Sequence, residues 1–336
     1  MPAVAFHLPV SCSLPFDSAL PLILVVALVA DAAIGDPDWM VRRIGHPVIW
    51  MGALIRRLDL GLNREDWGFA RRRAAGVLAL ATLVGIAGGA GWVLAALLAD
   101  IPGGDLAIAL VAATLLAQKS LRQHVAAVDR ALSHEGIDAG RQAVARIVGR
   151  DVAGLDEAGV RRAAIESLAE NFSDGVVAPV LWLAVGGLPG LCVYKAASTA
   201  DSMIGHRSPR HHAFGWAAAR LDDLLNWPAA RLAALLIALG AGRRARAALA
   251  IARRDGRRHL SPNAGWPEAA MAGALSCRLK GPRLYAGRIA EGEWLGDGPE
   301  DPGPQGIARG LRVAFRANGL LWLAAFALAG MALAAH

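Results

Sequence analysis

Three long stretches of this 336-residue chain contain no charged side chain, and they limit the possible folds more than any other feature. They cover residues 74–99, 175–194 and 317–335. An α-helix rises about 1.5 Å per residue, so about 20 residues cross the ~30 Å hydrocarbon core of a bilayer. Shorter apolar segments lie at 20–34, 106–118 and 228–242. A soluble helical core is the alternative, but runs of this length favour an all-α, polytopic membrane protein, with residues 1–336 forming one integral membrane unit.

The basic residues indicate how these segments are oriented. The formal net charge is +7, and arginines cluster beside apolar runs, at 71–73 and 243–244. This placement is typical of lipid headgroup contact on the cytoplasmic side rather than of a nucleic-acid-binding face. We therefore expect the lipid bilayer, and no nucleic acid, as a partner. We also expect the long polar segments 36–73, 119–174 and 243–316 to lie in the cytoplasm.

The apolar segment 175–194 is unusual because it contains helix-breaking residues. Pro179 lies near its start, and the run Gly186-Gly187-Leu188-Pro189-Gly190 follows. Broken helices are tolerated at membrane depth where they line a polar cavity or pack against protein. Two arrangements remain open. The segment crosses and 228–242 crosses back, or it re-enters and leaves on the same side.

Three acidic residues precede this segment at helical spacing. Glu166, Glu170 and Asp174 stand four residues apart, so a continuous helix would place them on one face. Carboxylates at a membrane boundary repel one another unless a cation or a hydrogen-bond donor is present. One interpretation is a Mg²⁺ site, because hard cations prefer oxygen ligands. The other is a solvated helix face that neighbouring arginines neutralise, and spacing alone does not decide between them.

A lysine and two hydroxyl side chains follow the broken segment. Lys195, Ser198 and Thr199 fall on one helical face, which suits a phosphate or a carboxylate, and Asp201 lies close by in the chain. A lysine that snorkels from a helix end to the membrane surface is a common structural alternative.

A further acidic pair lies in the run Arg220-Leu221-Asp222-Asp223-Leu224-Leu225-Asn226. Paired aspartates followed by an asparagine are able to bind a metal ion. They are equally able to form ion pairs with neighbouring arginines, so this run is also ambiguous when taken alone.

Taken together and in order, the polar segments resemble the CobD/CbiB family. The matching residues are 35–37, 46–48, 150–151, 166–175, 178–179, 186–190, 194–196, 199–203, 219–223, 226, 261–265, 267–270, 285 and 287. The sequence departs from the family pattern at three positions: the pattern leads us to expect Asn where Ser198 stands, an aromatic residue where His206 stands, and Gly where Lys280 stands. The resemblance covers roughly residues 31 to 287.

The resemblance implies an ATP-dependent amide ligation in cobalamin biosynthesis. The carboxylate substrate is a propionate of the corrinoid adenosylcobyric acid, and the amine is aminopropanol or aminopropanol phosphate. ATP and Mg²⁺ are the implied cofactors, and a bacterial-type inner membrane with a cytoplasmic active site is the implied location. No phosphate-binding loop motif of the form GxxxxGK[ST] is present, so the nucleotide site is not marked by a motif.

The resemblance also assigns roles to individual residues. It implies Glu166, Glu170 and Asp174 as metal ligands, and Glu170, Lys195, Asp201 and Asp223 as catalytic residues. The implied substrate-binding residues are Asp36, His46, Asn171, Ser198, Thr199, Arg220, Asn226, Asn263 and Glu268.

Two other classes of protein share some of these features. A membrane prenyltransferase also binds a metal-diphosphate with helical acidic clusters, but it should carry a second aspartate-rich repeat, which the sequence lacks. A corrinoid transporter also places polar residues around a broken helix, but it would usually show paired repeats. The long polar segments favour the ligase over both.

Overall fold

The computed structural model describes residues 19–35, 42–43, 45–206, 208–285, 288–290 and 292–335. Asp36, one of the expected substrate-binding residues, lies outside these ranges. The helices of the first half are α1 (Leu20–Ala33), α3 (Pro47–Leu62), α4 (Phe69–Leu98), α5 (Gly104–Ala113), α6 (Gln118–His134), α7 (Ile137–Val144), α8 (Glu157–Phe172) and the π-helix η1 (Ser173–Val177). The helices of the second half are α9 (Ala178–Ile204), α10 (Trp216–Gly240), η2 (Gly242–Arg244), α11 (Ala245–Asp255), η3 (Gly256–Arg258), α12 (Gly265–Leu275) and α13 (Gly306–Ala334).

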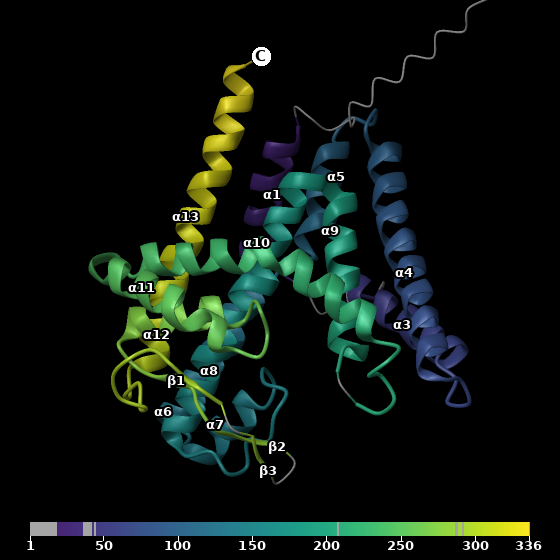
Figure 1. Cartoon of the computed structure of the whole chain (residues 1–336). Helices are drawn as coiled ribbons and strands as arrows, with labels where there is room; N and C mark the ends of the chain where they lie inside the picture. The colour runs from purple at the N-terminus through teal and green to yellow at the C-terminus, as the bar shows by residue number, and fades with distance from the viewer. Residues whose placement is uncertain are drawn as a thin grey trace, which may run out of the picture.

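The protein is an all-α, polytopic membrane protein. Within the described residues, five helical stretches are long and apolar enough to cross a bilayer by length and composition. They are Phe69–Leu98, Gly104–His134, Glu157–Ile204, Trp216–Gly240 and Gly306–Ala334. Figure 1 shows α4, α5, α13 and the shorter α1 standing upright, with the polar segments gathered below them. The apolar runs of the sequence at 74–99, 106–118, 175–194, 228–242 and 317–335 each overlap one of these stretches.

The stretch that contains α9 does not run straight, because the chain reverses inside it. Gly187 has φ 60° and ψ −157°, a conformation that is essentially confined to glycine. The hydroxyl of Tyr194 lies 2.7 Å from the carbonyl oxygen of Asp174, although 20 residues of straight helix would separate them by about 30 Å. A Cβ added to Gly190 would lie 2.7 Å from the carbonyl oxygen of Trp182. Residues 178–186 and 188–204 are therefore two arms of a helical hairpin.

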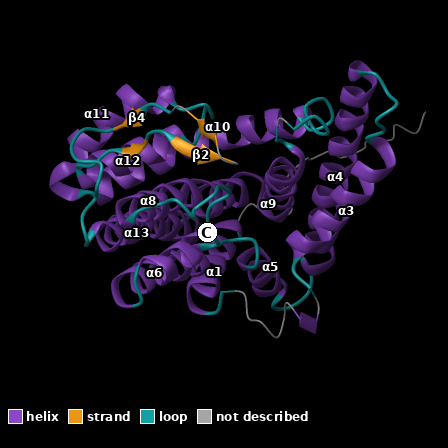
Figure 2. Ribbon diagram, turned by 90° about the horizontal axis from the view of Figure 1, so that it is seen from below, coloured by secondary structure: helices purple, strands orange, loops and turns teal. Residues whose placement is uncertain are grey.

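This hairpin decides between the two arrangements that the sequence left open. Its arms leave and return to the same end of the molecule, so the segment is re-entrant (Figure 1). The following helix α10 runs across the base of the upright helices in both Figure 1 and Figure 2. The Nε1–H group of Trp182 in the first arm donates to the carbonyl oxygen of Leu225 in α10, at 3.1 Å, and this bond joins the two elements.

The second arm packs closely on α4 because α4 has a stripe of small residues. Its buried positions recur about every four residues: Ala75, Gly76, Ala79, Leu83, Ala87, Gly91 and Ala95. A Cβ added to Gly91 would lie 3.0 Å from the Cα of Pro189, and one added to Gly88 would lie 2.9 Å from Val193. Small residues permit such close approach between membrane helices, where dispersion contacts replace the hydrophobic effect as the driving force.

A buried polar network joins the upright helices α1 and α13 to the first residue of α6. The backbone N–H and side-chain amide of Gln118 donate to Oδ2 of Asp31 in α1, at 2.8 and 3.0 Å. Its Oε1 accepts from Asn318 and Trp322 of α13, both at 2.8 Å. Asp31 interrupts an apolar helix, and these donors satisfy its carboxylate at a depth where an unpaired charge would be costly.

The long polar segments form the lower part of the molecule, seen from below in Figure 2. They contain α3, α6, α7, α8, α11, α12 and four short strands: β1 (Leu279–Lys280), β2 (Arg283–Tyr285), β3 (Arg288–Ala290) and β4 (Trp294–Leu295). β1 pairs with β4 and β2 with β3, both antiparallel. Lys280 has φ 68°, a left-handed conformation that favours glycine, which agrees with the family pattern at that position.

Candidate functional site

A cluster of carboxylates lies at the base of the re-entrant hairpin. Asp174 in the π-helix η1 interacts electrostatically with Glu170 of α8, Asp222 of α10 and Lys195 of the second arm of α9. These residues are far apart in sequence, and the chain reversal at Gly187 brings them together. We call Glu170, Asp174, Asp201, Asp222 and Asp223 the acidic cluster.

The rest of the acidic cluster extends along α9 and α10. Asp222 interacts electrostatically with Asp201, Asp223 and Glu170, and Asn226 forms a side-chain hydrogen bond with it. The Oδ1 atom of Asp222 is buried and has no hydrogen-bond partner. Carboxylates held this close repel one another, which favours the binding of a cation or of a cationic substrate group between them.

Tyr194 and Asn226 fix the geometry of the acidic cluster. Both side chains are buried, and the Tyr194 hydroxyl lies 2.9 Å from Oδ1 of Asn226 as well as 2.7 Å from the backbone of Asp174. The hydroxyl therefore ties η1, α9 and α10 to one another. The predicted site residue Asn226 thus supports the acidic cluster through its hydrogen bond with Tyr194.

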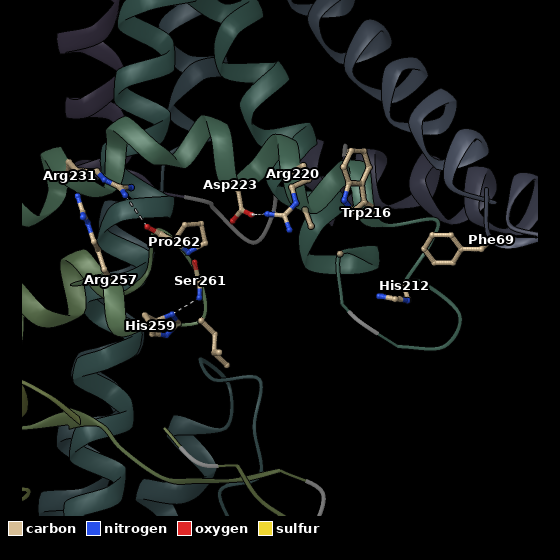
Figure 3. A pocket seen from close by; sticks show the side chains of 13 residues that line it. Phe69, His212, Trp216, Arg220, Asp223, Arg231, Arg257, His259, Ser261 and Pro262 are labelled. Carbon is tan, nitrogen blue, oxygen red and sulfur yellow. Dashed lines mark hydrogen bonds and ion pairs between the residues drawn. The ribbon is translucent and has the colours of Figure 1, made fainter. Parts of the chain in front are cut away.

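A cleft of about 630 Å³ opens beside the acidic cluster. Its walls include Phe69 of α4, Trp216, Arg220 and Asp223 of α10, and Arg257 of η3, together with the loop 259–262 (Figure 3). Gly205 also lines the cleft and packs against the carboxyl group of Asp201, since a Cβ at Gly205 would overlap Oδ1 of Asp201. Asp201 and Asp223 therefore connect the acidic cluster to the cleft.

Arg231 anchors one wall of the cleft. Its guanidinium group donates to Oδ1 of Asn263 at 2.6 Å and to the carbonyl oxygen of Pro262 at 3.1 Å. Asn263 in turn donates to the backbone carbonyl of Asp223 at 2.8 Å. The loop that follows η3 is thus bound to α10, and Figure 3 shows it facing Asp223 and Arg220.

The charges in the cleft are mainly positive. Arg231 and Arg257 both line it and repel each other electrostatically. Arg220 forms an ion pair with Asp223 at 3.2 Å, and its side chain remains 57 % exposed. Guanidinium groups that face one cleft favour an anionic ligand, above all a phosphate, which accepts several of their hydrogen bonds at once. A cationic wall and an acidic cluster therefore lie side by side.

Most of the predicted site residues lie at this place. The acidic cluster contains Glu170, Asp174, Asp201 and Asp223, and Lys195 interacts with it. Arg220 lines the cleft and Asn263 lies behind its wall. Glu268 is buried, with Oε2 3.9 Å from Nε2 of His259, whose ring lines the cleft.

Glu166 is placed differently from its two acidic neighbours. It is buried, its Oε2 accepts from Arg150 at 2.8 Å, and its Oε1 accepts from the backbone N–H of Lys280 at 2.6 Å. The structure therefore does not support a metal site shared by Glu166, Glu170 and Asp174. The physical reason is that Glu166 faces the polar segments, whereas η1 carries Asp174 toward α10.

Four other predicted residues make local contacts instead. Nδ1 of His46 accepts from the backbone N–H of Val48 and caps α3. Asn171 donates to the backbone of Ser167 at 2.9 Å and lines a separate cavity of about 350 Å³. The hydroxyl of Thr199 donates to the carbonyl of Lys195 at 2.6 Å, within its own helix. Ser198 forms a hydrogen bond with Tyr194.

The sequence interpretation passed over several residues that the structure places at the site. In the sequence, Asp222 stands out only as half of an acidic pair, and Tyr194 only as part of a motif that matches the family. Arg257 stands among several arginines of one basic segment, and nothing in the sequence separates it from the others. Only the fold shows which of them faces the cleft.

These observations define a polytopic helical membrane protein with a charged cleft at the base of a re-entrant hairpin. A family model described as CobD/Cbib protein matches residues 24–314, and the chain belongs to this CobD/CbiB family. It is 52 % identical over 303 residues to a cobalamin biosynthesis protein CobD of Sinorhizobium sp., covering 88 % of this chain and 94 % of that protein.

Further relatives agree with this family. A cobalamin biosynthesis protein CobD of Rhodobacter capsulatus is 50 % identical over 299 residues, which cover 88 % of this chain and 92 % of the relative. One of Brucella suis is 49 % identical over 280 residues, which cover 82 % and 86 %. No solved structure matches the chain.

Proposed function

We propose that the protein catalyses the ATP-dependent ligation of an amine to a propionate side chain of adenosylcobyric acid. The amine is aminopropanol or aminopropanol phosphate, and the product is adenosylcobinamide or its phosphate. The observation that carries this proposal is the cationic cleft directly beside the acidic cluster. A ligase of this type must bind phosphate groups and must also remove protons from an ammonium group. The family membership favours this reaction over a prenyltransferase or a transporter.

The reaction balances in two steps. The propionate carboxylate attacks the γ-phosphorus of ATP, which forms an acyl phosphate and releases ADP. The neutral amine then attacks the carbonyl carbon, the C–O bond to phosphate breaks, and inorganic phosphate leaves. The ammonium group must lose a proton before it attacks, and the amide nitrogen loses a second one.

The cleft and the acidic cluster divide this work between them. The guanidinium groups of Arg220 and Arg257 bind phosphate oxygens of the nucleotide, and Lys195 adds a compact cation at the transferring phosphate. Asp223 or Asp201 at the border of the cleft accepts the proton of the ammonium group. Because these residues belong to α9, α10 and η3, the fold holds the two reacting groups at one place.

The implied magnesium ion fits part of the acidic cluster. Within the part of the chain that the structure describes, no three His, Cys, Asp or Glu side chains are arranged to hold a metal ion by themselves. Magnesium is usually bound by one or two carboxylates together with nucleotide phosphates and water. Asp222, whose Oδ1 is buried without a hydrogen-bond partner, and Asp174 fit that requirement. When bound, the ion would neutralise negative charge on the transferring phosphoryl group.

The test is a reaction of the purified protein with adenosylcobyric acid, ATP and Mg²⁺, run in parallel with aminopropanol and aminopropanol phosphate. Formation of the amide and of ADP in equal amounts is expected with one or both amines. Amide formation without ATP hydrolysis, or no amide with either amine, would contradict the proposal. Arg257→Gln should raise the KM for ATP, whereas Arg253→Gln serves as a matched control, since Arg253 does not line the cleft.

A further inference from the structure

A second charged groove lies between α6 and the first half of α13, away from the cleft. It has a volume of about 750 Å³, and four arginines line it: Arg122 and Arg130 of α6, and Arg312 and Arg316 of α13. Phe315 lies between the two arginines of α13 and is 71 % exposed. The proposed ligation uses none of these residues.

Helix geometry explains why the arginines face one groove. Arg122 and Arg130 are eight residues apart, with the small side chain of Ala126 midway, and Arg312 and Arg316 are four apart. Residues at these spacings share one face of a helix. The two helix faces lie opposite each other across the groove, so all four guanidinium groups line it.

The arginines of this groove lack acidic partners. All four are exposed, and in the ranges that the structure describes none of them forms an ion pair with an Asp or Glu side chain. Asp129, the neighbour of Arg130 in the chain, interacts electrostatically with it. The four arginines outnumber this carboxylate, and like charges held together favour the binding of an anion.

The groove continues toward the apolar end of α13. A neighbouring hollow of about 360 Å³ shares Arg122 and Phe315 with the groove. Gln118, Lys119 and Asn318 line it together with Ala32, Gly319 and Trp322. The uncharged run 317–335 of α13 begins at this hollow, so the cationic groove lies next to the apolar part of that helix.

We infer that this groove binds an anionic phospholipid. Its phosphate lies among the four guanidinium groups, and an acyl chain follows Phe315, Gly319 and Trp322 along α13. Guanidinium groups offer a planar set of donors that matches phosphate oxygens, and basic pockets between membrane helices bind anionic headgroups. The site is separate from the proposed ligase site and does not depend on that reaction.

The experiment measures lipid binding to the purified, delipidated protein by native mass spectrometry. Phosphatidylglycerol and phosphatidylcholine with identical acyl chains are compared, and phosphatidylglycerol is expected to bind more tightly. The double substitution Arg312→Gln with Arg316→Gln should weaken its binding roughly thirtyfold, since each basic residue near an anionic headgroup contributes about a fivefold factor. The matched control is Arg243→Gln with Arg246→Gln, which removes the same charge from exposed positions outside the groove.

Three outcomes would overturn the inference. Equal weakening in both double variants would indicate a general charge effect, and equal binding of the two lipids would exclude headgroup recognition. Displacement of phosphatidylglycerol by millimolar ATP would assign the arginines to a nucleotide instead. Thermal unfolding without lipid checks that both variants fold. Should the α13 variant not fold, Arg122→Gln with Arg130→Gln tests the opposite wall of the same groove.

Discussion

Asp222 and Asp223 are neighbours in the chain, but their carboxyl groups have different surroundings. Asp223 lines the cleft and forms an ion pair with Arg220, whereas Asp222 lies among other carboxylates and has a buried, unpartnered Oδ1. The repulsion that Asp222 feels from Asp201, Asp223 and Glu170 destabilises the folded protein in the absence of ligand. A residue that costs stability in this way is typical of a site built to bind something.

Replacing Asp222 by Asn should therefore change stability and activity in opposite directions. The melting temperature of the ligand-free protein should rise by roughly 2–4 °C, because the repulsion is relieved. Ligation should fall by on the order of a hundredfold, because a ligand of the implied metal ion is lost. Thermal unfolding and product formation on the same sample measure both.

The control for this prediction is a carboxylate that is fully paired. Asp59 accepts from Asn63 at 2.7 Å and from Arg210 at 2.8 Å. Burial alone would raise the pKa of Asp59, but these hydrogen bonds and the charge of Arg210 hold it below the usual value. Asp59→Asn should lower the melting temperature. A lower melting temperature in both variants would show that Asp222 is also a structural residue.

Asp255 gives a prediction about pH. Its buried carboxylate accepts from Arg254 at 2.7 Å through both oxygens and from the backbone N–H of Gly296 at 2.9 Å. Burial alone would raise its pKa, but these bonds and the charges of Arg254 and Arg258 outweigh it and lower the pKa. A carboxyl group whose pKa is lower in the folded protein stabilises the fold. This contribution is fully present above the pKa of the unfolded state, about 3.9, and is lost as the pH falls through the pKa of the folded state.

Acidification from pH 5 to below about 4 should therefore destabilise the wild type more than Asp255→Asn. At pH 7 the same variant should be less stable by about 1–3 kcal/mol, because buried donors lose a charged acceptor. Melting temperatures of both proteins across this pH range give the answer. Parallel pH curves for the two proteins would rule out Asp255 as the titrating group.

At the scale of single residues, the sequence predicts the composition of the site better than its geometry. The spacing of Glu166, Glu170 and Asp174 suggests one face, yet Arg150 and the backbone of Lys280 bind Glu166 on another side. These partners are 16 and 114 residues away in the chain. Helical periodicity reports only local neighbours, so it cannot show which of three equally spaced acids a distant arginine neutralises.

At the scale of elements, the hairpin of α9 depends on one backbone conformation. Gly187 has φ 60° and ψ −157°, whereas a Cβ added there would meet nothing closer than 3.6 Å. The glycine is therefore needed for its backbone freedom and not for space. Its neighbour Gly186 is also uncrowded, with nothing within 4 Å of an added Cβ, and its φ is not positive.

This pair of glycines allows a matched comparison. Gly187→Ala should destabilise the protein by about 1–3 kcal/mol, because alanine is strained in that conformation. Gly186→Ala should be neutral or stabilising by up to ~1 kcal/mol, because alanine favours a helix. Thermal unfolding of both purified variants tests this. Equal effects of the two substitutions would mean that the chain does not reverse at Gly187.

The sequence predicted that this segment is broken but left its path open. Gly186-Gly187-Leu188-Pro189-Gly190 marks the position of the break, because glycine and proline act locally. Whether the second arm continues or returns depends on long-range contacts, such as the hydrogen bonds of Tyr194 and Trp182. Local propensity cannot report these contacts, and so both paths were compatible with the same residues.

At the scale of the whole molecule, the polar segments lie at one end, because the hairpin of α9 is re-entrant and α10 runs across the base of the upright helices. α1, α4, α5 and α13 stand upright, and α6, α7, α8 and α12 lie beneath them (Figure 1). Segments 36–73, 119–174 and 243–316 are rich in basic residues. The positive-inside bias therefore also predicts that these three segments lie on one side of the membrane. Charge statistics and the fold are independent observations, and they agree that the site has one accessible side, which we expect to be the cytoplasm.

Cysteine accessibility in intact cells tests this topology. In a background without Cys12, Cys192 and Cys277, single cysteines are placed at exposed positions on either side of the hairpin, at Asp151 and His212, and in the link between α4 and α5, at Asp100. A membrane-impermeant thiol reagent should label only Asp100→Cys, whereas Asp151→Cys and His212→Cys should react only after permeabilisation. If the segment 175–194 crossed the membrane instead, Asp151→Cys and His212→Cys would lie on opposite sides, and one of them would react in intact cells.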